Sequence, residues 1–283
     1  MTVGSSQRAK ANRFRALHHT DRLLVLPNAW DVPSARVFED AGFPAIATSS
    51  AALAASLGYP DGERIPKKEL FSVIRRIAGV LQVPLSVDAE SGYGESLDHL
   101  KATVRGLIAA GAVGLNIEDT VRAEGRSLRP VREQIARLRT IREVADSQGV
   151  PVVLNARTDA YTVGTRGASA RLDEAIQRGK AYEAAGADCL YPMGLVDRES
   201  ISTFVKAVKA PVNVMIRKGL PSVAELERIG VRRLSLGPAA MYATMGLLRR
   251  AGHELREKGT YESLTTGAIS FDELMALAAP ADR

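Results

Sequence analysis

Residues 110–115 read Ala-Gly-Ala-Val-Gly-Leu, and this short stretch decides how the chain is expected to fold. A helical segment ends before Gly111, a glycine turn follows, and an apolar strand begins at once. Residues 41–46 (Ala-Gly-Phe-Pro-Ala-Ile) and 185–190 (Ala-Gly-Ala-Asp-Cys-Leu) repeat the pattern. The repeated order of helix, glycine turn and strand predicts an α/β fold with a parallel sheet.

Eight short apolar runs are predicted to form strands, and the chain after each run contains a longer segment with helical periodicity. The predicted strands are residues 23–27, 45–48, 84–88, 114–117, 152–156, 189–191, 212–216 and 233–236. The predicted helices are residues 34–41, 67–81, 96–110, 132–148, 168–185, 198–208, 222–229 and 239–257. Eight such units predict a (β/α)₈ TIM barrel. A doubly wound open sheet is the alternative, but Pro27-Asn28-Ala29-Trp30-Asp31 stands where its glycine-rich fingerprint is expected.

The length and composition suit one globular domain. The 283 residues are 46% hydrophobic and 25% charged, and we expect a single barrel domain over residues 1–283. Within it, residues 1–20 are predicted to form an N-terminal extension or helix. Residues 258–283 are predicted to form a C-terminal helical tail with a last helix at residues 271–279.

The charge and the single cysteine limit the partners and the compartment. The net charge is +6, but the basic residues are scattered, so nucleic acid is not an expected partner, whereas a small anionic substrate is. No apolar run has the length of a membrane span, and the first twenty residues lack the apolar core of a signal peptide, so a cytoplasmic protein is expected. Cys189 is alone, which excludes an intrachain disulfide, and it is expected in the core.

Two carboxylates follow the third predicted strand. In the segment Val-Asp-Ala-Glu-Ser-Gly-Tyr-Gly at residues 87–94, Asp88 and Glu90 are two positions apart and would point to the same side of a strand. Neighbouring carboxylates repel unless a cation lies between them, and Mg²⁺ prefers such oxygen ligands. A solvated turn with two surface acids is the alternative explanation.

The next two strands end in further charged residues. Glu118 and Arg157 follow the fourth and fifth strands, so they are expected to share one pocket with Asp88 and Glu90 at the carboxyl ends of the barrel strands. Each polar residue alone also has a structural explanation, such as a helix cap or a satisfied core amide. Together they predict a Mg²⁺ site where Arg157 forks onto a substrate carboxylate, and the metal polarises a 2-oxo acid and stabilises an enolate.

These residues lie in segments that resemble the isocitrate lyase/phosphoenolpyruvate mutase superfamily over nearly the whole chain. The matching segments are residues 28–36, 48–50, 57–61, 88–94, 116–119 and 155–159. The resemblance implies a (β/α)₈ barrel whose last helix is swapped between subunits, in a homodimer or homotetramer. It also implies Mg²⁺ (or Mn²⁺) and chemistry through a pyruvate enolate.

Carried over by position, Asp88 resembles the direct metal ligand, and Glu90 and Glu118 resemble the acids that hold the metal's water ligands. Arg157 resembles the substrate-binding arginine and Asp61 an active-site aspartate. The general acid or base is not identified, and Tyr191 and Tyr93 are candidates. The predicted catalytic residues are Arg157, Glu118 and Tyr191, and the predicted substrate-binding residues are Trp30, Ser49, Ser50, Ala51, Asp61, Arg157 and Asn213.

The chain departs from the superfamily pattern in two loops. The loop at residues 120–130 lacks the Lys-(Lys/Arg)-Cys-Gly-His motif of isocitrate lyases, and no histidine follows the sixth strand as in the mutases. The same loop holds Arg122, Arg126 and Arg129 and is either a gate over the pocket or a solvated surface loop.

The leading hypothesis is therefore a Mg²⁺-dependent lyase or decarboxylase that cleaves a C–C bond in a small 2-oxo or 2-hydroxy carboxylate through an enolpyruvate, and not a true isocitrate lyase. A P–C bond enzyme, resembling phosphonopyruvate hydrolase or carboxyphosphonoenolpyruvate mutase, is the alternative. A catalytically silent barrel that binds a metabolite is the second alternative.

Overall fold

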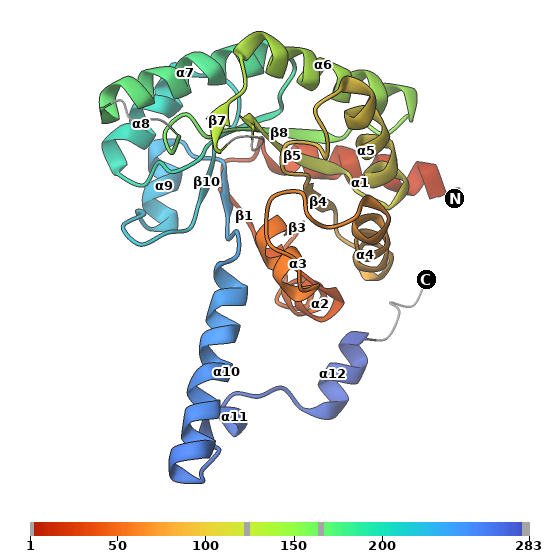
Figure 1. Ribbon diagram of the computed structural model, residues 1–283, viewed down its shortest axis with the longest axis vertical. Coiled ribbons are helices and arrows are strands. Elements are labelled where there is room, and N and C mark those ends of the chain that lie inside the picture. The colour runs from red at the N-terminus through yellow and green to blue at the C-terminus, as the bar shows by residue number, and fades with distance from the viewer. Residues whose placement is uncertain (1–2, 122–124, 164–166, 279–283) are drawn as a thin grey trace.

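The computed structural model describes residues 3–121, 125–163 and 167–278 and has the predicted barrel at its centre (Figure 1). One parallel sheet has the order β2-β3-β4-β5-β8-β9 and another the order β1-β11-β10. A single bridge between Leu190 and Val212 joins β9 to β10, and the chain runs directly from β1 into β2 through Pro27. The pairings therefore run around a closed ring of eight strand positions. The strands are β1 (Leu24–Leu26), β2 (Asn28–Ala29), β3 (Ile46–Thr48), β4 (Leu85–Asp88), β5 (Gly114–Glu118), β8 (Val153–Thr158), β9 (Cys189–Pro192), β10 (Asn213–Met215) and β11 (Arg233–Ser235).

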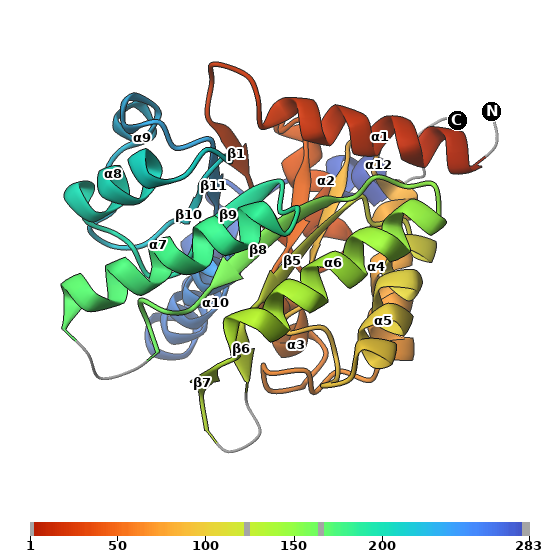
Figure 2. The same cartoon turned by 90° about the horizontal axis from the view of Figure 1, so that it is seen from above.

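Helices surround the strands, as Figure 2 shows for α4 to α7. The glycine turns form as predicted, because Gly42, Gly111 and Gly186 all have positive φ, at 87°, 106° and 97°, directly after a helix. The unpredicted elements include the short helix α3 and a hairpin of β6 (Thr120–Val121) and β7 (Ser127–Leu128). The helices that follow the strands are α2 (Val32–Asp40), α3 (Ser50–Ser56), α4 (Lys67–Val80), α5 (Leu97–Ala109), α6 (Val131–Ser147), α7 (Ala168–Ala184), α8 (Arg198–Ala207), α9 (Val223–Ile229) and α10 (Ala239–Lys258).

Helix α1 (Val3–Leu17) covers the N-terminal end of the barrel. Its side chains donate to carbonyls that precede the strands: Gln7 Nε2 to the Ala112 oxygen at 3.0 Å and Lys10 Nζ to the Leu81 oxygen at 2.7 Å. Phe14 is fully buried beside Gly114, where a Cβ would lie 2.5 Å from its ring. Gly114 therefore leaves the space into which α1 inserts its aromatic ring.

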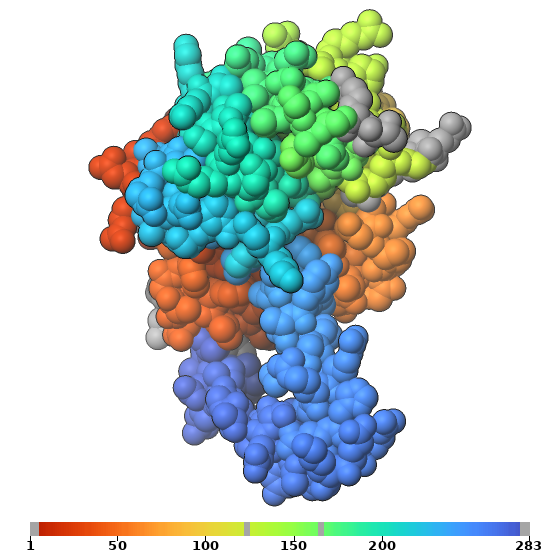
Figure 3. Space-filling model, turned by 90° about the vertical axis from the view of Figure 1, so that its left-hand side faces the viewer, coloured from red at the N-terminus to blue at the C-terminus, as the bar shows by residue number. Residues whose placement is uncertain are grey.

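The C-terminal segment forms an arm that extends away from the barrel (Figures 1 and 3). Helix α10 projects outward, α11 (Glu262–Thr265) packs on it, and α12 (Phe271–Ala278) returns to α2, where Arg36 Nε donates to the Leu277 oxygen at 3.0 Å. The arm exposes many large apolar side chains: Tyr242, Met245, Leu247, Leu248, Leu255, Tyr261, Leu264, Ile269, Phe271 and Met275. None of the helices in the described ranges is both long enough and apolar enough to span a membrane.

Candidate active site

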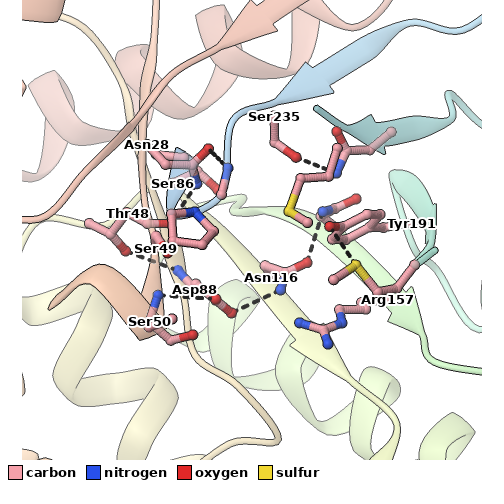
Figure 4. Close-up of a pocket in the computed structure, with 18 of the residues that line it drawn as sticks. Asn28, Thr48, Ser49, Ser50, Ser86, Asp88, Asn116, Arg157, Tyr191 and Ser235 are labelled. Carbon is pink, nitrogen blue, oxygen red and sulfur yellow. Dashed lines mark hydrogen bonds between the residues drawn. The ribbon is translucent and has the colours of Figure 1, made fainter. Parts of the chain in front are cut away.

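A cavity of about 430 Å³ opens at the carboxyl ends of the strands, and residues from almost every strand line it (Figure 4). Its size is that of a small-molecule site. Most of the residues predicted from the sequence line this cavity, namely Ser49, Ser50, Ala51, Asp61, Asp88, Arg157, Tyr191 and Asn213.

Three predicted residues are not among those that line the cavity: Trp30, Glu90 and Glu118. Strand β2 ends at Ala29, so Trp30 lies in the turn that begins α2, where its backbone N–H donates to Ser34 Oγ at 3.1 Å. Glu90 and Glu118 are buried behind the cavity wall. They can influence a ligand through charge or through water, but they do not form the surface of the cavity.

Asp88 ends β4, and neutral donors hold its carboxylate in place. Oδ1 accepts from Asn116 Nδ2 at 2.9 Å and from the Glu90 N–H at 3.2 Å, and Oδ2 accepts from the Ser50 N–H at 3.2 Å (Figure 4). Across the described residues, Asp88 forms no ion pair with an arginine or lysine. The carboxylate thus faces the cavity without a cationic side chain in direct contact among the described residues, so it is available as a ligand for a cation. Because the Ser50 N–H already donates to Asp88, this amide is not available to bind a substrate carboxylate.

Glu90 lies near Asp88, but not for the reason that the spacing suggested. The strand ends at Asp88, and Glu90 has a left-handed φ of 50°, so the rule that positions i and i+2 share a face of a strand does not apply. Its Oε2 accepts from the Glu63 N–H at 2.8 Å. Burial, followed by the negative charge of Asp88, raises the pKa of Glu90 to about 8. Without a cation Glu90 is therefore mostly protonated near neutral pH, and a cation bound beside it would favour the ionised form.

Arg157 is a residue of β8, and its guanidinium lies among charged side chains. Its Nη1 is 2.9 Å from Glu118 Oε2, while Nε and Nη2 fork onto Asp159 at 2.7 and 2.9 Å. Burial opposes the charged form, but the two carboxylates hold the pKa of Arg157 well above its usual range. These bonds use three of the five N–H donors of a guanidinium, which leaves two for a ligand.

The two tyrosines considered as acid or base differ in position. Tyr191 lines the cavity, with its hydroxyl 2.9 Å from Met193 Sδ. Burial raises the pKa of Tyr191 to about 12, so the phenol is a proton donor and not a base near neutral pH. Tyr93 is buried outside the cavity, with its hydroxyl 3.4 Å from Glu90 Oε1. Cys189 is fully buried in β9, and burial raises the pKa of its thiol to about 12, which confirms its assignment to the core.

The loop at residues 120–130 contributes one of its arginines to the cavity. Arg126 lines it and donates from Nη2 to Asp159 Oδ2 at 2.9 Å. Arg129 is buried and instead pairs with Glu95 at 2.7 Å. Arg122 lies outside the described residues. This loop therefore contacts the site through Arg126 and Asp159.

Several lining residues were not among the predicted site residues, including Asn155, Arg217 and Arg233. Arg233 opens β11, whereas the prediction gave most weight to the carboxyl ends of the strands. The alternation of Arg233 and Ser235, both of which line the cavity, is the signal that was present, because positions i and i+2 share a face of a strand.

The residues present fit a Mg²⁺ ion held mainly through water. The described residues contain no group of three or more acidic, histidine or cysteine side chains at metal-ligand spacing. Magnesium often takes only one or two carboxylates and keeps several waters. Asp88 would supply a direct carboxylate, and the buried acids Glu90 and Glu118 lie behind it.

Comparison with known proteins agrees with this geometry. The sequence model of the phosphoenolpyruvate phosphomutase family matches residues 14–256. The chain belongs to this family. It therefore lies within the isocitrate lyase/phosphoenolpyruvate mutase superfamily, as the sequence motifs predicted, and is an enzyme of that superfamily.

Relatives of the family are similar over nearly the full chain. The 2-methylisocitrate lyase of Escherichia coli is 32% identical, over 92% of this chain and 89% of that protein. An oxaloacetate decarboxylase of Bradyrhizobium is 30% identical, over 93% of both. A solved structure from Burkholderia cenocepacia, provisionally described as a lyase or mutase, is 36% identical with a TM-score of 0.89, over 97% of this chain and 98% of that chain. These similarities confirm the barrel fold.

Proposed function

We propose that this enzyme is a Mg²⁺-dependent lyase or decarboxylase that cleaves a C–C bond in a small 2-oxo or 2-hydroxy carboxylate through an enolpyruvate. The observation that carries the proposal is the carboxylate of Asp88. It faces the cavity without a cationic partner among the described residues, with Arg157 in the same cavity. A divalent cation, Mg²⁺ or Mn²⁺, supplies the Lewis acidity that polarises a 2-oxo group.

The side chains of the chain itself bind the substrate and move protons. The two remaining N–H donors of Arg157 bind the carboxylate next to the 2-oxo group. Tyr191, protonated near neutral pH, donates a hydrogen bond to the oxygen that gains negative charge. Among the described residues that line the cavity, Asp61 and Asp88 are the two with carboxylates. Because Asp88 is assigned to the metal, we assign Asp61 the role of proton acceptor.

The activities of two relatives support a small carboxylate as the substrate. They are a 2-methylisocitrate lyase and an oxaloacetate decarboxylase, whose substrates are small carboxylates. The cysteine of the isocitrate lyase loop motif is missing from residues 120–130, and Cys189 is buried in β9. Acid catalysis by a cysteine at that loop is therefore not part of the proposed reaction.

A P–C bond enzyme is the second candidate, and the name of the matching family favours it. Against it, residues 190–194 read Leu-Tyr-Pro-Met-Gly, without the histidine of the mutases. A direct test incubates the enzyme with Mg²⁺ and a panel of 2-oxo acids, 2-hydroxy acids and phosphonopyruvate, with EDTA as the control. Pyruvate from a carboxylate substrate supports the lyase. Phosphate detected by ³¹P NMR identifies the alternative, and turnover that persists in EDTA contradicts the metal requirement.

We also propose that the enzyme is a cytoplasmic homodimer or homotetramer in which the C-terminal arm contacts a second subunit. The arm extends from the barrel with its large apolar side chains exposed, including Phe271 at 74%. An apolar surface of this extent is characteristic of an interface between subunits.

A further inference from the structure

Arg233 lies at the deep end of the cavity, in a position that the proposed function does not use. It is the first residue of β11, is 2% exposed and lines the cavity. Its guanidinium carbon is 5.9 Å from the centre of the Phe14 ring, and Phe14 belongs to the helix that covers the N-terminal end of the barrel. Arg233 therefore belongs to the floor of the cavity, whereas Arg157 lies near the carboxyl end of β8.

The guanidinium of Arg233 has no hydrogen-bond or ion-pair partner among the residues that the structure describes. Its Nε and Nη1 are buried and unpartnered. Arg178, also buried, differs, because its Nη1 donates to the Arg129 oxygen at 2.8 Å and lies 3.2 Å from Asp119 Oδ2. A buried charge without a partner raises the free energy of the folded protein. We therefore expect an anion or polar groups of a ligand to pair with this guanidinium.

Other polar groups of the cavity are also unpartnered. Asn155 Oδ1 and Asn213 Oδ1 are buried without a hydrogen-bond partner in the described ranges, and both residues line the same cavity. A TIM barrel interior is usually filled by bulky branched side chains. Here small or polar residues occupy these positions, including Ser86 and Ser235, and the cavity stays open down to Arg233.

We propose that Arg233 binds a second anionic group of the substrate, so that the substrate is a dicarboxylate. This inference rests on the proposed function, in which the 2-oxo end lies at Asp88 and Arg157. The second carboxylate accepts hydrogen bonds from Arg233, and a hydroxyl or a water beside it donates to Asn155 and Asn213. Because a guanidinium stabilises a carboxylate more than the carbon dioxide formed from it, this carboxylate is retained in the product. The reaction is then a cleavage between the two carboxylates.

The test compares ligands with one and two carboxylates by calorimetry in the presence of Mg²⁺. Pyruvate is the monoanion, and malate, 2-oxoglutarate and 2-oxoadipate are dianions of increasing length. In the unaltered enzyme, at least one dianion should bind about tenfold more tightly than pyruvate, the effect of one charged hydrogen bond. Arg233→Met should abolish this preference and leave pyruvate affinity within about twofold. Arg232→Met, at the neighbouring residue outside the cavity, is the matched control and should change neither.

Two results overturn the inference: no dianion preferred over pyruvate, or a preference that survives Arg233→Met. Replacement of an unpaired buried charge by methionine should not unfold the protein. If it does, Arg233→Lys decides, because it keeps the charge, loses the planar fork and should reduce the preference without affecting pyruvate. Asp88→Asn separates this inference from the proposed function. It should weaken the binding of pyruvate and of the dianions by the same factor. Unchanged affinities would contradict the proposed metal site. In that case the preference for dianions that is due to Arg233 could still be measured.

Discussion

At the scale of the residue, Arg157 contacts two acidic side chains of the site at once. It bonds Glu118 from one nitrogen and forks onto Asp159 from two others, and Asp159 also accepts from Arg126. Burial alone would raise the pKa of Asp159, but the charge of Arg157 and these hydrogen bonds lower it. Asp159 therefore remains ionised, and its two bonds help to fix the orientation of the guanidinium toward the cavity.

We expect Arg157→Lys to lower both stability and activity. Lysine keeps the charge but cannot fork onto Asp159 and reach Glu118 together, so two buried carboxylates lose hydrogen bonds. The free energy of unfolding in urea should fall by about 2 kcal/mol or more, and turnover should fall by at least about tenfold. Arg139→Lys, an exposed change on α6, is the control. A variant with full activity would show that the fork does not orient the substrate.

At the scale of the element, the eight strand–helix units were predictable because glycine turns and unbroken apolar runs are local signals. Helix α3 was not predicted, since its sequence of Ser, Ala and Leu lacks the length of a periodic segment. Asp88 and Glu90 were expected to point to the same side by the geometry of a strand, but the φ of Glu90 is 50°, a value that spacing cannot reveal. Arg233 was overlooked because its burial depends on α1 and on the closure of the barrel.

The contact between α1 and the barrel depends on the absence of a side chain at Gly114. A methyl group there would lie 2.5 Å from the Phe14 ring and 2.9 Å from Ser86 Oγ. Gly114→Ala should therefore lower the free energy of unfolding by about 1–3 kcal/mol. Gly79→Ala in α4 meets nothing within 4 Å and should be neutral or stabilising. Equal unfolding curves for the two variants would contradict the packing of Phe14.

Helix α1 also carries a buried histidine that should make the fold sensitive to acid. Burial, then the positive charge of Arg233, lowers the pKa of His18 to about 3, while an unfolded histidine has a value of about 6.5. Between these values the unfolded chain binds more protons, so stability decreases as the pH falls, by up to about 1.4 kcal/mol per pH unit. His18→Gln should lose less stability than the unaltered protein from about pH 6.5 to pH 5, whereas the exposed change His19→Gln should match it. Urea unfolding at each pH measures this, and parallel curves for all three proteins would refute it.

At the scale of the whole molecule, the C-terminal arm leaves its own barrel. Helix α10 extends outward (Figure 3). Its side chains Tyr242 and Leu248 are 66% and 52% exposed. The swapped last helix that the sequence resemblance implied would place these side chains against a second subunit, which stays a prediction.

Light scattering after size-exclusion chromatography should give the mass of a dimer or tetramer. Leu248→Glu should shift the protein toward the monomer, because a charge would be buried in the interface. Arg249→Glu, a change of charge at the next position of the helix, serves as the comparison. A monomeric unaltered protein would contradict the proposed assembly.

The central claim is that Asp88 binds a divalent cation, and calorimetric titration with Mg²⁺ tests it most directly. The unaltered enzyme should bind Mg²⁺, and Asp88→Ala should abolish the binding because the direct carboxylate ligand is gone. Asp98→Asn, which changes a carboxylate that is 89% exposed, should bind as the unaltered enzyme does. Unchanged Mg²⁺ affinity in Asp88→Ala would contradict the account.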